Sequence, residues 1–530
     1  MPGRKGSSMQ NRSTTYETLT GKADRGGTMF KPGSGGVAEA AAAPEVRFSR
    51  PSRHRYPIGL DEFQKLKEEA PTKKDAFRPR ARTFMDAAAM TPDLRSAAPA
   101  PVPAEFAAGF AGIPATGWLP YDCALAVGKA HVMCSVNSSV AAFDRSGTRA
   151  FQTTLTSWFK TVLPAAATVF DPRLIYDPAA DKYILVAAAN NNDNQQSWFL
   201  ISVSQTGDPT GSWWSYILDA TVDGSTQTNN WADYPGLGQD GSAIYLTANM
   251  FQWNDGPFQY AKLRIVPKQA LYTGGTPTFA DLVGMKNADG SLVFGLQPAN
   301  VLDAGATVQL VNTIYPTPDS PTQNEITVWS VQNPTSGPIV QSQAVSCASY
   351  AIPPHADQKG GAPPLDTGDV RVMNVVLRDG FLWASFVTQF NWEGDPTNVA
   401  AIFWIQLDGN QKLAQQGVFG ASGMHYFYPA IVPLALEGCL MVFSRSSPND
   451  YASLSAAGRK KGDKAGTFGP SAMVEVGTNT YTGLDGSGRN RWGDYSAVSP
   501  DPTDVGSGWV YGGYVSGLNQ WSTWVSSGKP

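Results

Sequence analysis

The chain has 530 residues, of which 42% are hydrophobic and 11% aromatic but only 16% charged. This length calls for one large repeat domain or for several ordinary domains. The 53 glycines and 39 prolines are typical of many short strands joined by tight turns. The net charge of −4 conceals an asymmetry, because residues 1–100 carry +7 and residues 101–530 carry −11. The acidic body argues against nucleic acid as a partner.

The first 116 residues predict a largely disordered basic extension that ends in an Ala/Pro-rich linker. Within it, residues 58–67 predict a short amphipathic helix with Leu60, Phe63 and Leu66 on one face. The basic residues are interpreted as a solvated tail rather than a docking arm. No apolar run is long enough for a membrane span, and the first 36 residues lack the apolar core of a secretory signal. We therefore expect no transmembrane segment.

A short polar motif recurs along residues 117–530 and marks the start of a repeated unit. Successive copies lie 49 to 71 residues apart, which suits four strands per unit. Asp-Gly pairs at 240, 379 and 408 add hairpin signals between the copies. The sequence predicts an all-β seven-bladed β-propeller over residues 117–530, and a pair of β-sandwiches competes because the fourth unit is irregular. The anchors of the units are Asp122, Asp171, Asp233, Asn300, Arg371, Tyr428 and Asp494.

The motifs resemble those of a poorly characterised group of bacterial, mostly extracellular β-propeller proteins. The matching segments span residues 118–524 and are Asp171-Pro172-Arg173, the run from Ser204 to Trp213, Trp231-Ala232-Asp233-Tyr234-Pro235, Tyr428-Pro429-Ala430 and Arg491-Trp492-Gly493-Asp494-Tyr495. The resemblance implies export or display at the cell surface, and it implies no established activity. The Ser204–Trp213 run also resembles, more loosely, the Asp-box turn of sialidase-like propellers.

Residues of the entry motifs are the candidates for a ligand site. Because the motif precedes the innermost strand of each blade, its side chains are expected to surround one mouth of the central channel. Such a ring could bind a hydroxyl-rich or acidic ligand through arginine forks. The structural alternative, which we favour, is that each Asp caps the turn of its own blade. The candidate set is Asp122, Asp171, Arg173, Asp233, Arg371, Asn374, Tyr428, Arg491 and Asp494.

Two further questions stay open at this level. Asp122, Asp233 and Asp494 are candidate ligands for Ca²⁺, which prefers carboxylate and carbonyl oxygens. Cys123 and Cys134 are symmetric about the turn at Gly128-Lys129, and two half-buried thiols are favoured over a bridge.

Two functions from different classes compete. The first is a non-enzymatic binding or scaffold propeller that recognises a glycan or protein partner. The second is a sialidase-like glycoside hydrolase with Tyr428 as nucleophile and an Asp as acid. Glu is scarce in the body, and none of its five Glu residues lies in an entry motif. Binding is therefore the preferred hypothesis.

Overall fold

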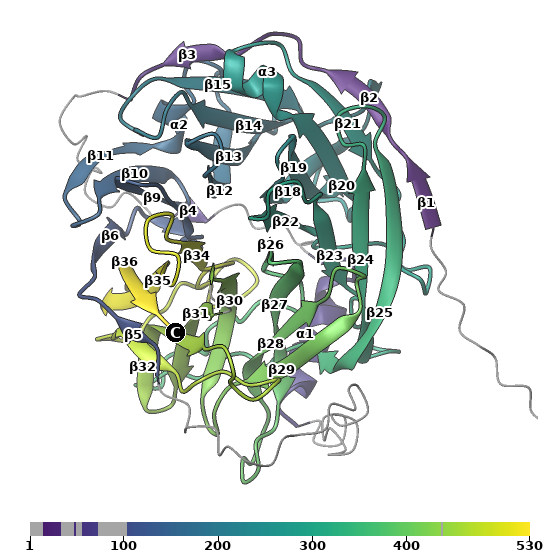
Figure 1. Cartoon of the computed structure of the whole chain (residues 1–530). Helices are drawn as coiled ribbons and strands as arrows, with labels where there is room; N and C mark the ends of the chain where they lie inside the picture. The colour runs from purple at the N-terminus through teal and green to yellow at the C-terminus, as the bar shows by residue number, and fades with distance from the viewer. Residues whose placement is uncertain (1–13, 33–46, 49–55, 73–102, 436–437) are drawn as a thin grey trace, which may run out of the picture.

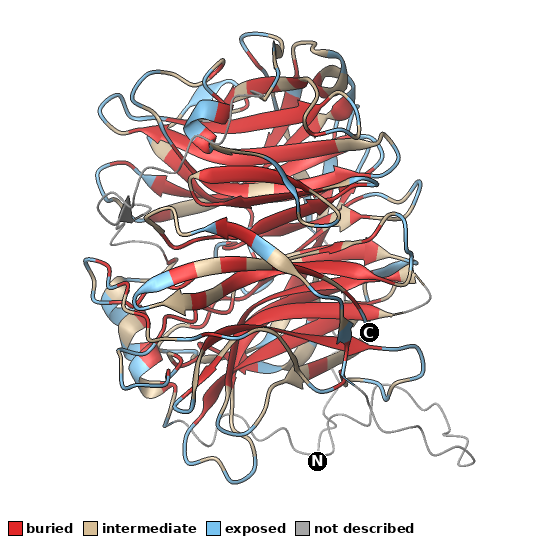
Figure 2. Cartoon of the chain, turned by 90° about the vertical axis from the view of Figure 1, so that its left-hand side faces the viewer, coloured by how far each residue is buried: buried red, intermediate tan, exposed pale blue. Residues whose placement is uncertain are grey.

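The computed structural model describes residues 14–32, 47–48, 56–72, 103–435 and 438–530. Within this part the chain is nearly all β, and antiparallel sheets stand in a ring around a common centre (Figure 1). Most strand residues are buried while the connecting loops are exposed (Figure 2). The ring arrangement replaces the alternative of paired sandwiches.

Consecutive strands form the antiparallel groups of the ring. Within each group the first strand lies nearest the centre, and the following strands lie successively farther out (Figure 1). The first three groups are β8–β11 (Ala124–Val127, His131–Val136, Ser139–Asp144, Arg149–Thr154), β12–β15 (Thr168–Asp177, Lys182–Asn191, Gln196–Ser204, Trp213–Asp219) and β18–β21 (Asn230–Gln239, Ala243–Gln252, Phe258–Pro267, Thr278–Leu282). The next three are β22–β25 (Gln297–Val301, Gln309–Thr313, Thr322–Gln332, Ile339–Ala351), β26–β29 (Asn374–Arg378, Phe381–Phe390, Val399–Leu407, Leu413–Phe419) and β30–β33 (His425–Pro433, Cys439–Ser447, Asp450–Arg459, Ala472–Glu475).

Neighbouring groups touch at their innermost strands. A single parallel pairing joins Gln239 of β18 to Asn300 of β22, and a short parallel ladder joins β22 to β26. These contacts merge three groups into one 14-stranded sheet. The fourth group, which was irregular in sequence, is therefore held in the ring by hydrogen bonds on both sides of its inner strand.

The two ends of the ring meet in one sheet. Its strands are β34 (Ala497–Pro500), β35 (Gly508–Gly517) and the C-terminal β36 (Gln520–Lys529). β36 also pairs with β5 (Glu105–Phe106) and β6 (Phe110–Pro114). The strand that contains Trp521–Val525 therefore shares a sheet both with segments shortly before Trp118 and with strands that follow Asp494. This pairing leaves no free edge between the ends.

The prediction of disorder in the N-terminal extension is wrong for the segments that the structure describes. β1 (Thr14–Glu17), β2 (Leu19–Lys22) and β3 (Thr28–Phe30) pair with β25, β21 and β15, the outermost strands of three groups. In Figure 1 they run along the outer rim. Their side chains are mostly exposed, so these strands are ordered by backbone pairing with sheet edges. Amino-acid composition gives no sign of such pairing, which is why the sequence did not predict it.

The remaining elements are short. α1 (Leu60–Glu69) buries Phe63 and Leu66, as the sequence predicted, and lies behind the ring in the view of Figure 1. No helix in the described ranges is long and apolar enough to cross a membrane. The other short elements are α2 (Leu155–Trp158), α3 (Lys268–Thr273), β4 (Arg47–Phe48), which pairs with β7 (Trp118–Leu119), and the hairpin of β16 (Val222–Asp223) with β17 (Thr226–Gln227).

Cys123 and Cys134 are unbridged in the structure, and both are fully buried rather than half-buried. Register explains the result, because Cys134 of β9 lies opposite Leu125 of β8 rather than opposite Cys123.

Candidate functional site: a polar cavity and a central pocket

A backbone bulge explains why the entry motif recurs. Asp171, Tyr234 and Tyr428 adopt left-handed φ angles of 51°, 53° and 51°, and each precedes a proline. The strand register shifts at these positions in β12, β18 and β30. Proline has no N–H for the ladder, and the left-handed residue kinks the strand. The structural equivalent of Asp171 is consequently Tyr234, one residue after the anchor predicted from sequence.

The bulges bring most of the predicted residues to one mouth of the ring. Of the nine candidates, Asp171, Asp233, Arg371, Tyr428, Arg491 and Asp494 line a single cavity of about 30 Å³, which we call the polar cavity. That volume has space for about two water molecules. The other lining residues are Tyr56, Tyr234, Asp366, Gly368, Met373 and Arg489.

The arginines of the polar cavity are already paired with carboxylates. Arg371 donates to both oxygens of Asp369 at 2.8 and 2.7 Å. Arg491 donates through Nη2 to both oxygens of Asp494 at 2.7 and 2.9 Å. A two-oxygen pairing satisfies charge and direction together. An acidic ligand would therefore have to break an existing ion pair.

Asp366 is a buried carboxylate of the cavity with positively charged side chains nearby. Burial alone would raise its pKa, yet the charges of Lys67 and Arg489 hold that pKa well below the usual range. The Nζ of Lys67 lies 3.8 Å from Asp366, and Nη1 of Arg489 lies 3.9 Å from it. Sequence reasoning missed Asp366 and Arg489 because they lie in loops outside the entry motifs, and it did not select Asp369, which lies two residues before the anchor Arg371.

The segment 56–72 covers this mouth. The Tyr56 hydroxyl accepts a 2.5 Å hydrogen bond from Arg489, and Lys67 donates to Thr367 at 2.7 Å. At the far end of the segment, Asn398 donates from its side chain to the Ala70 carbonyl at 2.7 Å. The segment 56–72 therefore lies over the polar cavity and narrows access to it.

Asp122 does not face the cavity. It is fully buried, and its carboxylate accepts hydrogen bonds from the Asn137 side chain and from the backbone N–H of Asp494. Asn137 in turn accepts from the backbone N–H of Asp171 at 2.7 Å. Burial, with Asp494 and Asp171 nearby, raises the pKa of Asp122 well above its usual value. Asp122 therefore links three groups of the ring through hydrogen bonds and does not cap only the turn of its own blade.

The candidate calcium ligands do not fit a cation. Within the described ranges, no three His, Cys, Asp or Glu side chains come together as a ligand set. Both Asp122 oxygens accept protein hydrogen bonds, and Asp494 is paired with Arg491. Ca²⁺ needs six to eight oxygen ligands.

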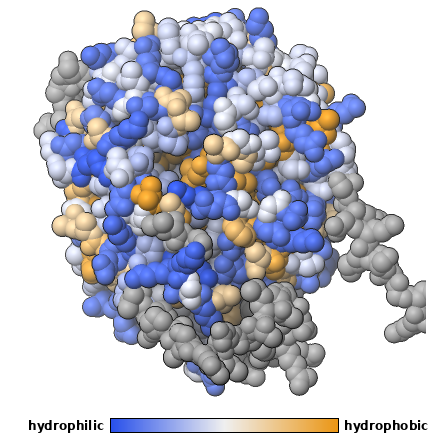
Figure 3. Space-filling view, in the orientation of Figure 1, coloured by the Kyte–Doolittle hydropathy of each residue, from blue (hydrophilic) through white to orange (hydrophobic). Residues whose placement is uncertain are grey.

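A second cavity, the central pocket, opens at the opposite face and was not foreseen. Its volume is about 270 Å³, and it is lined by the inner strands of every group. Hydrophobic surface gathers around the centre of this face in Figure 3, and the exposed Val505 belongs to the rim. The walls include Leu125, Ile175, Leu237, Leu302, Val376 and Val498. In sequence these residues look like ordinary strand core, which is why they gave no signal.

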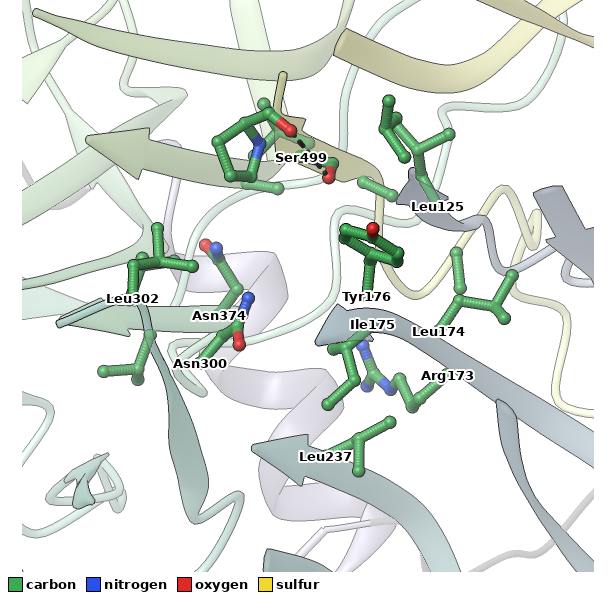
Figure 4. A pocket seen from close by; sticks show the side chains of 18 of the residues that line it. Leu125, Arg173, Leu174, Ile175, Tyr176, Leu237, Asn300, Leu302, Asn374 and Ser499 are labelled. Atoms are coloured by element: carbon green, nitrogen blue, oxygen red, sulfur yellow. Dashed lines mark hydrogen bonds between the residues drawn. The ribbon is translucent and has the colours of Figure 1, made fainter. Parts of the chain in front are cut away.

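The last two predicted residues, Arg173 and Asn374, lie in the central pocket (Figure 4). Asn374 is structural, because it donates to the Ile431 carbonyl at 2.8 Å and accepts from the Ile431 N–H at 2.9 Å. Arg173 donates through Nε to the Pro235 carbonyl at 2.8 Å, while its Nη2 has no hydrogen-bond partner among the described residues.

A layer of stacked side chains separates the two cavities. The Arg371 guanidinium lies 4.5 Å from the centre of the Tyr234 ring, and the Arg173 guanidinium lies 5.2 Å from the same ring. Arg173 also lies 3.5 Å from the centre of the Tyr495 ring. Met373 lines both cavities. The channel is thus divided into a small polar end and a larger, mostly apolar end.

Neither the protein-family models nor the curated sequences that were compared with the chain match it. Solved structures similar to it include the Dos1 propeller, with 10% identity, 76% of this chain and 75% of that chain covered, and a TM-score of 0.35. An α-L-arabinofuranosidase from Fusarium graminearum has 10% identity, coverage of 79% and 98%, and a TM-score of 0.35. Trypanosoma rangeli sialidase has 9% identity, coverage of 77% and 58%, and a TM-score of 0.35. Scores this low carry no argument about activity, so the function is argued from the site.

Proposed function

We propose that the protein is a non-enzymatic binding protein built as a seven-bladed β-propeller over residues 117–530, with residues 105–114 adding strands to its last blade. The partner enters the central pocket from the open face. The antiparallel groups around a common centre and the closure of β36 onto β6 support this architecture. Of the glycan and protein partners expected from sequence, the apolar walls favour a protein or another ligand with apolar parts.

The observation that carries the proposal is the contrast between the two ends of the channel. The central pocket measures about 270 Å³, whereas the polar cavity, with the carboxylates that hydrolysis requires, measures about 30 Å³. A largely apolar pocket with a few polar groups is the usual form of a small-ligand site.

Hydrolysis of a glycoside remains the second candidate function, because Tyr428 is available as a nucleophile. Its hydroxyl lies in the polar cavity and has no hydrogen-bond partner in the described part of the chain. Burial, with Asp366 and Asp494 nearby, raises the pKa of Tyr428 well above its usual value. Because a raised pKa disfavours the ionised form, the Tyr428 hydroxyl is a poor nucleophile. The polar cavity is also too small for a sugar ring.

Ligand-observed NMR with a library of small fragments tests the proposal. We expect bound fragments whose signals are lost in Leu302→Trp, which fills the central pocket, and retained in Leu518→Trp, which alters an exposed residue in the β35–β36 turn. A panel of chromogenic glycosides, sialosides included, should show no turnover. The proposal is wrong if fragments bind Leu302→Trp as well as they bind wild type. It is also wrong if glycoside turnover persists through purification and disappears in Tyr428→Phe.

A further inference from the structure

We infer that the central pocket takes a ligand in which a carboxylate is joined to an apolar body, with the carboxylate held by Arg173 and Gln297. This inference rests on the proposed function, since it names the ligand class of the same pocket. Its basis is a set of buried donors at the base of an apolar chamber.

Arg173 supplies the charge. Its guanidinium is fixed by the Nε bond to the Pro235 carbonyl and by stacking 3.5 Å from the centre of the Tyr495 ring. Figure 4 shows the guanidinium directed into the pocket from β12. The Nη2 atom, buried and without a described partner, still has donors to satisfy. A buried donor left unpaired is costly, and more so when it is charged, so binding of a ligand acceptor that reaches this donor is favoured.

Gln297 supplies a second donor in the same pocket. It is 4% exposed, lines the pocket, and its Nε2 also has no partner among the described residues. A methyl group on Gly236 would lie 2.9 Å from Oε1 of Gln297, so this side chain lies beside the residue that follows Pro235. Because Pro235 is the residue that Arg173 binds, the Arg173 and Gln297 side chains converge on one stretch of β18.

The Ser496 hydroxyl, on a residue that is 6% exposed, is a further pocket-lining group without a described partner. A guanidinium, an amide N–H and a hydroxyl together favour a ligand group that accepts hydrogen bonds and carries negative charge. A cation is disfavoured because Asp501, the lining carboxylate at the rim, is already bound by Arg145.

The walls above these donors determine the rest of the ligand. Leu237 and Val376 are 9% and 5% exposed, and the wall side chains named above are aliphatic. A cavity of about 150 Å³ lined by such residues holds benzene. A pocket of about 270 Å³ therefore accommodates an aliphatic body of about eight carbon atoms. A sugar would leave its hydroxyls against these walls without partners, which is costly.

A carboxylate on an apolar body has two sources, a free aliphatic acid or the C-terminus of a peptide that ends in an apolar residue. Octanoate represents the first source and a pentapeptide ending in Leu the second. Octanamide and the C-terminally amidated pentapeptide are the neutral counterparts of these probes.

Isothermal titration calorimetry on the full chain tests the inference. We expect octanoate, the free-acid peptide or both to bind, and the neutral counterparts to bind at least tenfold more weakly. Arg173→Lys keeps the positive charge but loses the planar guanidinium with its fixed pair of donors. It should therefore weaken carboxylate binding at least tenfold. Gln297→Leu removes the second donor and should weaken it severalfold. Arg149→Gln, which removes a positive charge at an exposed position on β11 outside the pocket, should leave the affinity unchanged.

Melting temperatures of the variants show that each is folded before its affinity is compared. The inference is wrong if neither acid binds, if the neutral probes bind as well as the acids, or if Arg149→Gln weakens binding as much as Arg173→Lys. If neutral fragments still bind and lose their site in Leu302→Trp, the proposed function stands while the carboxylate inference falls.

Discussion

The Arg173 guanidinium lies 3.5 Å from the centre of the Tyr495 ring, and the Tyr495 hydroxyl donates to the Pro172 carbonyl at 3.2 Å. The two residues belong to the second and last groups of the ring, so they tie distant parts of the sequence across its centre. Arg173 also lines the central pocket. The same pair therefore supports both the closure of the ring and the orientation of the donor that we assign to the ligand.

The first prediction concerns this pair. Tyr495→Leu removes the stacking on Arg173, which contributes up to about 2 kcal/mol when desolvated. Tyr495→Phe keeps the ring and loses only a hydrogen bond of about 1 kcal/mol. Thermal unfolding should rank Leu as clearly more destabilising than Phe. Equal effects would show that the stacking contributes little.

The second prediction concerns Asp122. Asp122→Ala leaves the Asn137 amide and the Asp494 N–H without their acceptor in a buried site, at about 1–3 kcal/mol each. Asp122→Asn keeps one acceptor oxygen and should cost less. Both variants are compared with wild type by thermal unfolding, with and without Ca²⁺. A melting temperature that rises with Ca²⁺ in wild type and not in Asp122→Ala would restore the calcium interpretation.

The third prediction concerns pH. Burial, with a smaller contribution from the Lys67 charge, lowers the pKa of His425 to about 4, against about 6.5 in an unfolded chain. His425 is 5% exposed, and its Nδ1 accepts from the Ala400 N–H at 3.2 Å, which requires a neutral ring. The unfolded state binds the extra proton between these pKa values, so stability is complete above pH 6.5 and falls as pH drops to 4.

This loss amounts to about 3 kcal/mol for His425. His425→Asn should make the fall in melting temperature between pH 6.5 and 4 shallower, and His131→Asn, at the start of β9, should not. An unchanged slope in His425→Asn would mean that other groups control the acid response.

The fourth prediction concerns the segment 56–72. Phe63 is 1% exposed and stacks on Tyr56 with ring centroids 3.6 Å apart, so Phe63→Ala should loosen this segment by about 3–5 kcal/mol. We expect proteolysis within residues 56–72, and faster hydrogen exchange there, before the sheets respond. Leu60→Ala, at a less buried position on the same helix, is the control. Simultaneous cleavage throughout the chain would contradict local release.

Features that depend on a few neighbouring residues could be predicted from the sequence. Features that depend on contacts between distant segments could not. The entry motif was found because its bulge needs a left-handed residue and usually a proline, although the anchor Asp233 was misplaced by one residue from Tyr234. Asp122 was placed with the wrong partners because its hydrogen bond to Asp494 joins residues 372 positions apart. The pocket wall could not be predicted, since an aliphatic strand has the same sequence pattern whether it faces a packed core or a cavity. The rim strands β1–β3 could not be predicted, since backbone pairing with a sheet edge leaves no pattern in the sequence.

The last prediction concerns the closure of the ring between β36 and β6. Gly112 of β6 has no room for a side chain, because a Cβ there would lie 2.6 Å from Oγ1 of Thr523 and 2.8 Å from the Tyr511 ring. Thr523 also donates to the Ile113 carbonyl at 2.7 Å, so any shift of β6 breaks this bond. Gly112→Ala should therefore lower the melting temperature of the entire domain.

Gly241→Ala is the matched control, because a Cβ at Gly241 would meet nothing within 4 Å. Removal of residues 520–530 should be more severe than Gly112→Ala, since it also removes Trp521 and Val525, which are 2% and 0% exposed. If closure holds the ring together, both changes lower one cooperative transition, followed by circular dichroism and by tryptophan fluorescence. An early transition confined to the last sheet, with the rest melting as in wild type, would mean that the remaining groups are stable without closure.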